Sequence, residues 1–507
     1  MIMSKSQKIL LLFLIVVLNI VIRLQAISLE IGIDSFFIHL MTNSLSEFGS
    51  AKWWLHPLSV PGLYPYSYTS TLQYLLSGVH QMTDMSMNSV ILLYGMSVGL
   101  LGIFSGYLIG FAIDPDDDLY KILCAFAFSF APSVVGYSTW TIPTRGLLIV
   151  FGPLFFYMLV KSLISKKYIF LTLVICLFLF VTHHLFYFLL PPLLGYALLR
   201  ILNLYSKYKG AVFIDERFHA VIYLFGFILM FSIPFVTGKF VEQSRYMFFD
   251  VHYIRYIGVP IIFVFGGIVS LIFKPNKKFT EKFLLLSLVL LTFFIFQLTY
   301  MKMFAPVIAI PFAILGLNNA YKTIPKKKYS AILLAFFLIS STIFVGYFQF
   351  LHEYSFSRRQ MDENTYITGT WMKNYCNGSA ISNDDLLGMR LFTVSEHVHF
   401  LVMSSVIDHI YGFIGSNVSE FKRFPLTSDN FWLNGYEGPD PGNYLWADLN
   451  RMQKNPIDYN ISYVAENDRA YGQIVWSHSP RASDLIAYSE NNADNIYSSG
   501  EISIWYL

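Results

Sequence analysis

One carboxylate and several cationic side chains in this sequence have types and positions that suit group-transfer chemistry. Asp34 stands just after the first long apolar stretch, and His39 follows five residues later. The other candidates stand at the ends of later apolar stretches; they are Arg145, His183, His184, Glu242, Arg245, Arg255 and Lys302. A carboxylate can accept the proton of an attacking hydroxyl, and cations can stabilise a departing phosphate. The set therefore favours transfer of a group away from a phosphate.

Most of these candidates also have a purely structural interpretation. Asp34 is a good helix N-cap, and capping is compatible with a role as a base. A histidine pair such as His183–His184 at a helix end is more typical of a hydrogen-bonded turn than of a ligand. Arg145 can reach the membrane interface by snorkelling. Glu242 and Arg245 are three residues apart and can pair on one helical turn.

The composition predicts that lipid surrounds most of the chain. The sequence has 507 residues, of which 55% are hydrophobic and 13% charged, whereas a soluble protein carries roughly 25% charge. Apolar stretches of about 20 residues recur as far as residue 350, so we expect about eleven transmembrane helices. The predicted spans are 8–28, 87–112, 119–138, 144–163, 168–184, 185–204, 218–237, 252–273, 282–299, 303–320 and 329–350.

The distribution of Lys and Arg predicts the orientation. With the N-terminus in the cytoplasm, the inner segments hold about 18 of these residues and the outer segments about 6. An odd number of spans then places the C-terminal part outside the cell. The sequons at Asn377, Asn417 and Asn460 agree with that side. We therefore expect a multi-pass protein of the cell membrane.

We expect two domains, a transmembrane domain over 1–350 and a soluble extracytoplasmic domain over 351–507. The first domain contains a long first outer loop at 29–86. In this loop, apolar residues from Phe36 to Phe48 recur at helical spacing, which predicts an amphipathic helix in the plane of the membrane interface. A second amphipathic helix is expected from about Ser70.

The C-terminal segment has the pattern of a small α/β domain. We expect a helix over 363–375 with Tyr366, Ile367, Trp371 and Met372 as its apolar face. Strands are expected over 379–383 and 461–465, and the last residues predict a hairpin that turns at Ser499-Gly500. The three cysteines have no metal-ligand spacing. The absence of a long basic run argues against nucleic-acid binding.

The segment Gly32-Ile33-Asp34-Ser35-Phe36-Phe37-Ile38-His39 resembles a family pattern. The pattern is an Asp, a small residue or Pro, aromatic residues and then a His. It is similar to the GT-C membrane glycosyltransferases, which include the oligosaccharyltransferase catalytic subunits and the polyprenyl-phosphate-sugar-dependent transferases. The resemblance covers residues 1–200 and would put the family's first-loop carboxylate on Asp34. It would also suit an archaeal cell surface.

The sequence departs from the oligosaccharyltransferases in two places. The C-terminal segment lacks their Trp-Trp-Asp-x-Gly motif, and the loop 136–145 has Arg145 where an acidic pair is expected. A transferase of single sugars from a polyprenyl-phosphate donor therefore fits better than one that recognises sequons. A divalent cation, Mg²⁺ or Mn²⁺, stays open as a cofactor.

The resemblance implies an integral-membrane glycosyltransferase that moves a hexosyl group to a glycan, lipid or protein acceptor on the outer face, with Asp34 as the general base. The alternative is a transporter or flippase of a lipid-linked glycan or other solute. Transporters usually carry charges at mid-depth and internal repeats. The predicted spans here are nearly free of such charges, which favours the enzyme.

Overall fold

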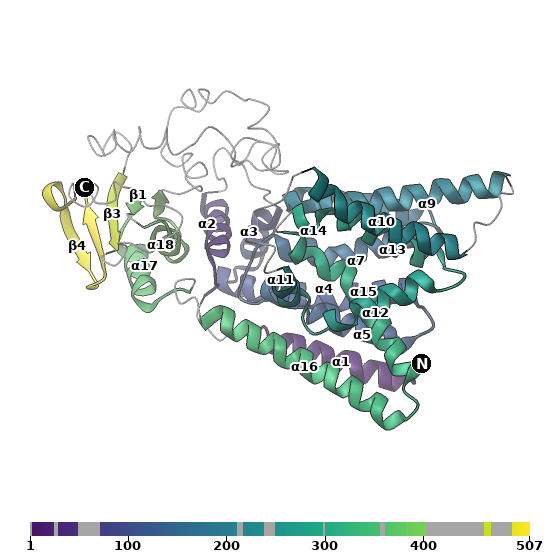
Figure 1. Ribbon diagram of the computed structural model, residues 1–507. Helices are drawn as coiled ribbons and strands as arrows, with labels where there is room; N and C mark the ends of the chain where they lie inside the picture. Colours follow the sequence, from purple (N-terminus) through teal and green to yellow (C-terminus); the bar gives the residue numbers. More distant parts are fainter. Residues whose placement is uncertain are drawn as a thin grey trace. The chain divides into compact units, whose positions relative to one another are not determined.

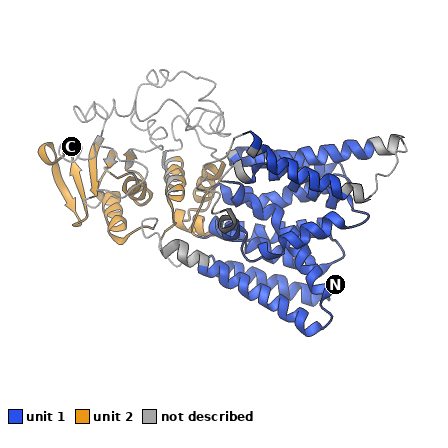
Figure 2. Cartoon of the chain, in the orientation of Figure 1, with its two compact units in different colours: residues 1–24, 94–139, 144–355 blue, residues 25–93, 140–143, 356–507 orange. Residues whose placement is uncertain are grey.

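The computed structural model describes residues 3–24, 29–48, 71–209, 216–237, 249–297, 300–354, 360–382, 384–401, 461–467 and 489–507. The chain forms two compact units, shown in Figure 2. The first consists of residues 1–24, 94–139 and 144–355 and is called the membrane unit below. The second consists of residues 25–93, 140–143 and 356–507 and is called the loop–sheet unit. The first outer loop, expected within the transmembrane domain, thus groups with the C-terminal residues in this division.

The described part of the membrane unit is built from helices, most of which are labelled in Figure 1. Each predicted span overlaps one described helix or two consecutive ones, and the ends of two spans, 25–28 and 298–299, lie outside the described residues. The helices are α1 (Lys5–Val21), α4 (Met87–Ile113), α5 (Asp118–Ser129), α6 (Pro132–Gly136), α7 (Arg145–Lys161), α8 (Lys167–Thr182), the 3₁₀ helix η2 (His184–Leu189), α9 (Leu190–Lys209), α10 (Glu216–Val236), α11 (Phe249–Ile257), α12 (Ile261–Phe273), α13 (Phe279–Thr292), α14 (Phe294–Gln297), α15 (Met301–Thr323) and α16 (Lys327–Tyr354).

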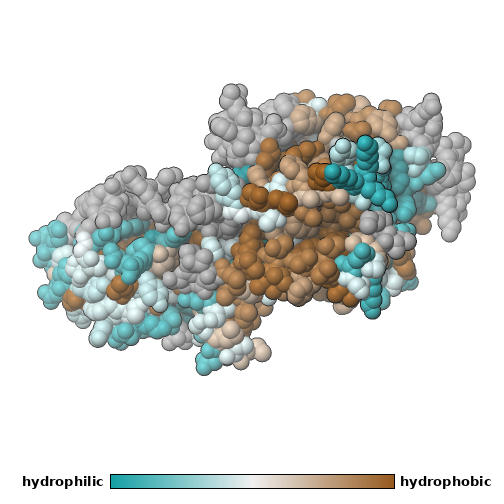
Figure 3. Space-filling model, turned by 90° about the horizontal axis from the view of Figure 1, so that it is seen from below, coloured by the Kyte–Doolittle hydropathy of each residue, from teal (hydrophilic) through white to brown (hydrophobic). Residues whose placement is uncertain are grey.

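Among the described residues, four helical segments are long and apolar enough to cross a membrane by length and composition, namely Met87–Ile113, Leu185–Leu204, Met301–Thr323 and Lys327–Tyr347. Large apolar side chains also face outward; on α16, Phe336, Ile339 and Ile343 are 59–66% exposed. Figure 3 shows this hydrophobic surface as a broad brown area. These features agree with a polytopic α-helical membrane protein. The number of eleven spans stays a prediction.

Two predicted spans are broken where helix-interrupting residues occur. The span 119–138 divides into α5 and α6, with Pro132 in the first turn of α6. The span 252–273 divides at Gly258, which has a φ of +79°, a conformation that favours glycine. A Cβ at Gly258 would lie 3.0 Å from Cδ of Pro132, so the two breaks pack against each other. Such breaks shorten the continuous helices.

A charged network holds together the N-terminus, α5 and α15. Asp117 caps α5 by accepting from the Tyr120 N–H. Its other oxygen accepts from Lys322 at 2.9 Å. Asp118 pairs with Lys121 at 2.7 Å and with Lys8 at 3.0 Å. These contacts assign a structural role to both carboxylates.

Arg23, just beyond α1, is buried with an exposure of 1%. Its guanidinium donates to Oγ of Ser138 and, at 2.8 Å, to Oδ1 of Asn19. A Cβ at residue 99 would lie 2.6 Å from Arg23 Nε, so glycine is needed there. These bonds tie the end of α1 to the segment that follows α6.

The described part of the loop–sheet unit combines helices with a five-stranded sheet. The helices are α2 (Ile33–Phe48), α3 (Thr71–Thr83), α17 (Glu363–Tyr375) and α18 (Asp385–Ser395), and the strands are β1 (Ser379–Ser382), β2 (His399–Leu401), β3 (Ile461–Asn467), β4 (Asp494–Ser498) and β5 (Ile502–Tyr506). The sheet order is β2-β1-β3-β5-β4. β1 runs parallel to β2 and β3, whereas β5 is antiparallel to β3 and β4. The predicted strands and the hairpin at Gly500, where φ is +82°, are confirmed.

The predicted apolar face of α17 was partly wrong. Met372 is buried, but Tyr366 and Ile367 are 43% and 49% exposed. The buried face carries small residues instead, because α17 packs closely on α18: a Cβ at Gly369 would lie 2.6 Å from Cβ of Val394. Apolarity alone therefore pointed to the wrong side of the helix.

Both helices predicted in the first outer loop are present, as α2 and α3. The described apolar side chains of α2, including Phe36 and Met41, are buried in protein. Asn43 Nδ2 donates to the carbonyl of Thr393 on α18 at 3.3 Å, and Ser46 bonds to Ser77 on α3 at 3.0 Å. The described side of α2 thus contacts α18 and α3, and the position of this helix at the membrane interface stays a prediction.

Candidate functional site

Asp34 lies in the first turn of α2, and its side chain is exposed. Gly32 begins this turn with a φ of +95°, and its carbonyl accepts from the N–H groups of Ser35 and Phe36 at 3.0 and 3.1 Å. A carboxylate that reaches the surface from a fixed helical turn can take part in proton transfer. The sequence therefore positions Asp34 by local backbone geometry.

A second segment, residues 140–142, holds the turn of Asp34 from its two sides. The carbonyl of Trp140 accepts from the Ile31 N–H at 2.6 Å, and the Ile142 N–H donates to Oγ of Ser35 at 3.1 Å. Trp140 has a φ of +54°, which is unfavourable for a bulky side chain. We call these two hydrogen bonds the Trp140 clasp. Strain at one residue is thus combined with a contact that fixes the candidate base.

His39 does not point into solvent but pairs with Glu30. The His39 Nδ1 lies 2.7 Å from Glu30 Oε1, and both residues are 2% exposed. Oε2 of Glu30 is buried and has no hydrogen-bond partner. A buried ion pair needs its partner to avoid a large desolvation cost. The described contact of His39 therefore fixes the start of α2 to the segment before it.

In the membrane unit, Arg145 is surrounded by aromatic rings. Its guanidinium lies 5.8 Å from the centroid of Tyr137 and 5.3 Å from that of Tyr300. Arg145 is the first residue of α7 and Tyr300 the N-cap of α15, so the two helix starts lie together. A cation over aromatic faces is stabilised and still carries its charge.

Lys302 and Arg255 belong to the same region. Lys302 Nζ lies 5.5 Å from the ring centroid of Tyr256 on α11, the neighbour of Arg255. The Tyr137 hydroxyl interacts with both Tyr256 and Arg145, which joins the two halves. We name the set of Tyr137, Arg145, Arg255, Tyr256, Tyr300 and Lys302 the cation–aromatic cluster. It brings together Arg145 and Lys302, and Arg255 adjoins it in sequence through Tyr256.

His183 is buried and acts in a turn. Its Nδ1 accepts from the Leu185 N–H at 3.0 Å and caps η2. Tyr187 of η2 interacts electrostatically with Tyr300, so this turn adjoins the cation–aromatic cluster. His184 is the first residue of η2. Its side chain, together with Glu242 and Arg245, lies outside what the structure describes.

Several residues of this region were not found from the sequence. Glu30 lies nine residues from His39, and no spacing rule relates a loop carboxylate to the following helix. Tyr137, Tyr256 and Tyr300 come from three separate segments of an aromatic-rich chain. A tyrosine close in sequence to a predicted cation, as Tyr256 is to Arg255, is the sequence signal that could have indicated such a cluster.

The described residues do not provide the ligands that a divalent cation requires. No group of three or more His, Cys, Asp or Glu side chains that could hold a metal occurs among them. Mg²⁺ and Mn²⁺ prefer several oxygen ligands. In this part of the chain, one oxygen of Glu30 is already paired with His39. We therefore derive no reaction step through a metal ion.

Solved structures share this architecture. The apo oligosaccharyltransferase of Archaeoglobus fulgidus matches with a TM-score of 0.58 and 12% identity, over 92% of this chain and 70% of that chain. ArnT from Cupriavidus metallidurans bound to undecaprenyl phosphate matches with a TM-score of 0.59 and 10% identity, over 99% and 98%. The arabinofuranosyltransferase AftD from Mycobacteria matches with a TM-score of 0.50 and 13% identity, over 100% and 42%.

All three are GT-C glycosyltransferases. This chain has the GT-C fold. The predicted resemblance is therefore confirmed at the level of the fold. No family model matches the sequence, and no curated protein matches it significantly. The GT-C fold supports a membrane location and leaves the substrate and the role of each residue to be argued from the side chains.

Proposed function

We propose that this chain is a membrane glycosyltransferase that moves a hexosyl group from a polyprenyl-phosphate-linked donor to a glycan, lipid or protein acceptor. The reaction would take place on the outer face of the cell membrane, with the N-terminus in the cytoplasm and the C-terminal residues outside. The observation that carries the proposal is an exposed carboxylate, Asp34, on a turn held by the two hydrogen bonds of the Trp140 clasp within a GT-C fold.

In the proposed reaction, Asp34 takes the proton of the acceptor hydroxyl as the oxygen attacks the anomeric carbon. The bond between the anomeric carbon and the phosphate oxygen breaks, and the lipid phosphate leaves with the bonding electron pair. Arg145, Arg255 and Lys302 of the cation–aromatic cluster stabilise that negative charge. Tyrosine rings lie against Arg145 and Lys302 and do not neutralise them, which supports this role.

The other predicted residues have supporting parts in this proposal. His39 fixes the turn of Asp34 through Glu30, and His183 fixes the turn beside the cluster. Glu242, Arg245 and His184 stay candidates for contacts with the donor. ArnT was solved bound to undecaprenyl phosphate and the oligosaccharyltransferase with a dolichol-phosphate. These ligands support a polyprenyl-phosphate donor as the first class to test.

The test is a sugar-transfer assay with purified full-length protein and polyprenyl-phosphate hexoses. Asp34→Asn should lower kcat by roughly 100-fold or more, because general-base catalysis contributes about 10²–10⁴. Asp116→Asn, which removes another exposed carboxylate, is the matched control and should retain activity. Full activity of Asp34→Asn would remove this base. No transfer by the wild type, together with solute flux in proteoliposomes, would favour the transporter alternative.

A further inference from the structure

We propose that Arg390 is a positioning residue that fixes the helix carrying Asp34. The inference deepens the proposed function, since it assigns the C-terminal residues a role in orienting the candidate base. Arg390 lies on α18 and is 8% exposed. Burying an arginine has a desolvation cost unless its charge is compensated by a partner. Its contacts therefore indicate what the charge does.

One contact of Arg390 is made to α2. Its guanidinium carbon lies 5.6 Å from the ring centroid of Phe36, which is fully buried. Phe36 lies two residues after Asp34, and its N–H belongs to the turn closed by the Gly32 carbonyl. A cation over a desolvated ring is a stronger contact than the same pair in water. A shift of this ring would therefore move the turn that carries Asp34.

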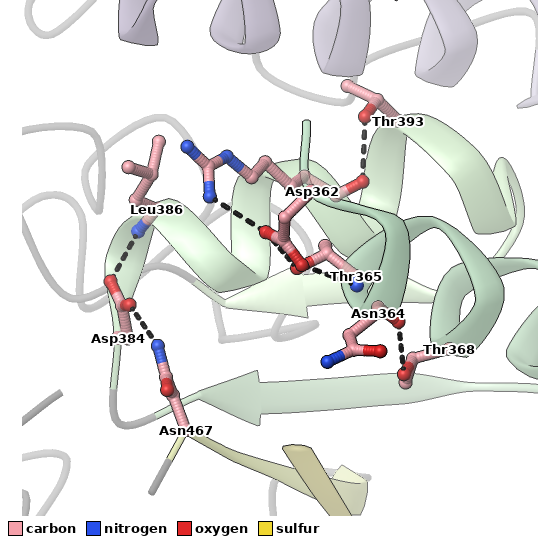
Figure 4. A network of polar contacts seen from close by, with 9 residues as sticks. Asp362, Asn364, Thr365, Thr368, Asp384, Leu386, Thr393 and Asn467 are labelled. Carbon is pink, nitrogen blue, oxygen red and sulfur yellow. Dashed lines mark hydrogen bonds and ion pairs between the residues drawn. The ribbon is translucent and has the colours of Figure 1, made fainter. Parts of the chain in front are cut away.

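The same guanidinium group also binds Asp362. Nη1 of Arg390 lies 3.2 Å from Oδ2 of Asp362. The same carboxylate accepts from the N–H and hydroxyl of Thr365 at 2.8 and 2.7 Å and caps α17. Figure 4 shows the Asp362 carboxylate directed at Thr365, with Thr393 on the neighbouring helix. The N-cap of α17 therefore fixes the position of the guanidinium that contacts α2.

A second bond between α18 and α2 restricts rotation. Asn43 Nδ2 of α2 donates to the carbonyl of Thr393, three residues after Arg390. The two contacts are seven residues apart on α2, which corresponds to two helical turns, so they fix both its distance and its rotation about its axis. Small rotations matter here, because misplacing a reacting group by about 1 Å can cost 10²-fold in rate.

The experiment compares Arg390→Met, Arg390→Lys and Phe36→Leu in the full-length protein in nanodiscs. Arg390→Met keeps most of the stem and removes the charge. We expect amide exchange over residues 33–48 to rise about tenfold, a change of roughly 1.4 kcal/mol. Turnover should fall about tenfold or more with little change in the donor KM. Arg390→Lys should rescue only in part, because a lysine lacks the planar guanidinium.

A matched control removes another cation of the same unit. Lys373 of α17 pairs with Glu396 at 2.6 Å, with both side chains 42–47% exposed. Lys373→Met should leave α2 exchange and turnover unchanged. Cys376 reports on folding of the unit: it is buried, and burial raises the pKa of its thiol to about 11, opposed by a hydrogen bond with Tyr463. It should resist maleimide in every folded variant.

Each outcome decides between the hypotheses. Unchanged exchange over 33–48 in Arg390→Met with Cys376 protected would overturn the positioning role, whatever the activity. If Cys376 becomes reactive in that variant, Phe36→Leu decides instead, and unchanged exchange there also overturns it. Raised exchange in a protein whose wild type transfers no sugar would leave the positioning role standing and refute the proposed function.

Discussion

His39 Nδ1 and Glu30 Oε1 lie 2.7 Å apart, and both side chains are almost completely enclosed. This pair joins the segment before α2 to the second turn of that helix, so it spans Asp34 in the sequence. The second oxygen of Glu30 is buried and has no hydrogen-bond partner among the described residues. No second hydrogen bond of that carboxylate would therefore compensate for the loss of His39. Its loss is expected to affect the local structure more than any exposed ion pair would.

We predict that His39→Leu destabilises the loop–sheet unit by about 3–5 kcal/mol, because it leaves the Glu30 carboxylate buried and unpaired. The double variant Glu30→Leu/His39→Leu should recover much of this loss, since no unpaired charge remains. Chemical unfolding of the full-length protein, followed through maleimide reaction of Cys376, measures the effect. A single variant as stable as the wild type would contradict the role of this pair.

Gly32→Ala should destabilise the same unit by about 1–2 kcal/mol, since Gly32 has a φ of +95° and a left-handed residue costs this much with a Cβ. No atom lies within 4 Å of the added Cβ, so the effect comes from the backbone and not from a clash. Gly346→Ala, in α16 and also with open space, is the control and should be neutral or slightly stabilising. Equal effects of both variants on the unfolding midpoint would show that φ at Gly32 is unimportant.

The sequence predicted the helices well because apolar length and helix caps are local signals. The positions of α2, α3 and the C-terminal hairpin followed from such signals. The site depended on contacts between distant segments. The Trp140 clasp links residues more than 100 positions apart, and Arg390 meets Phe36 across more than 350. No periodicity carries that information, so Glu30, Trp140 and Arg390 were found only in the structure.

The Asp118 carboxylate should make the membrane unit sensitive to acid. Its hydrogen bond from Lys121, followed by those from the Met3 backbone and Lys8, holds its pKa well below the usual range. A lowered pKa contributes stability that is present above the unfolded value of about 3.9 and is lost as the pH falls below it. Thermal unfolding in detergent from pH 6 down to about pH 3 measures this loss. The unfolding temperature of Asp118→Asn should depend less steeply on pH than that of the wild type. The exposed control, Asp116→Asn, should follow the wild type. Identical slopes for Asp118→Asn and the wild type would refute the prediction.

The two ends of α15 offer a matched test of phosphate binding. Lys302 is at the start of this helix, and its Nζ lies 5.5 Å from the ring centroid of Tyr256. Lys326 is just beyond the end of the helix, and its Nζ lies 5.8 Å from the ring centroid of Tyr329. The helix has 23 residues, so these similar cation–π pairs are roughly 35 Å apart along its axis.

If the cation–aromatic cluster binds the donor phosphate, Lys302→Gln should raise the donor KM or lower kcat by about 10-fold or more, since a charge-assisted hydrogen bond is worth roughly 1.5–3 kcal/mol. Lys326→Gln removes the same charge from a similar ring and should change neither constant. Initial rates over a range of polyprenyl-phosphate-hexose concentrations separate KM from kcat. Equal effects of the two substitutions would mean that the loss of a lysine, and not its place in the cation–aromatic cluster, alters the enzyme.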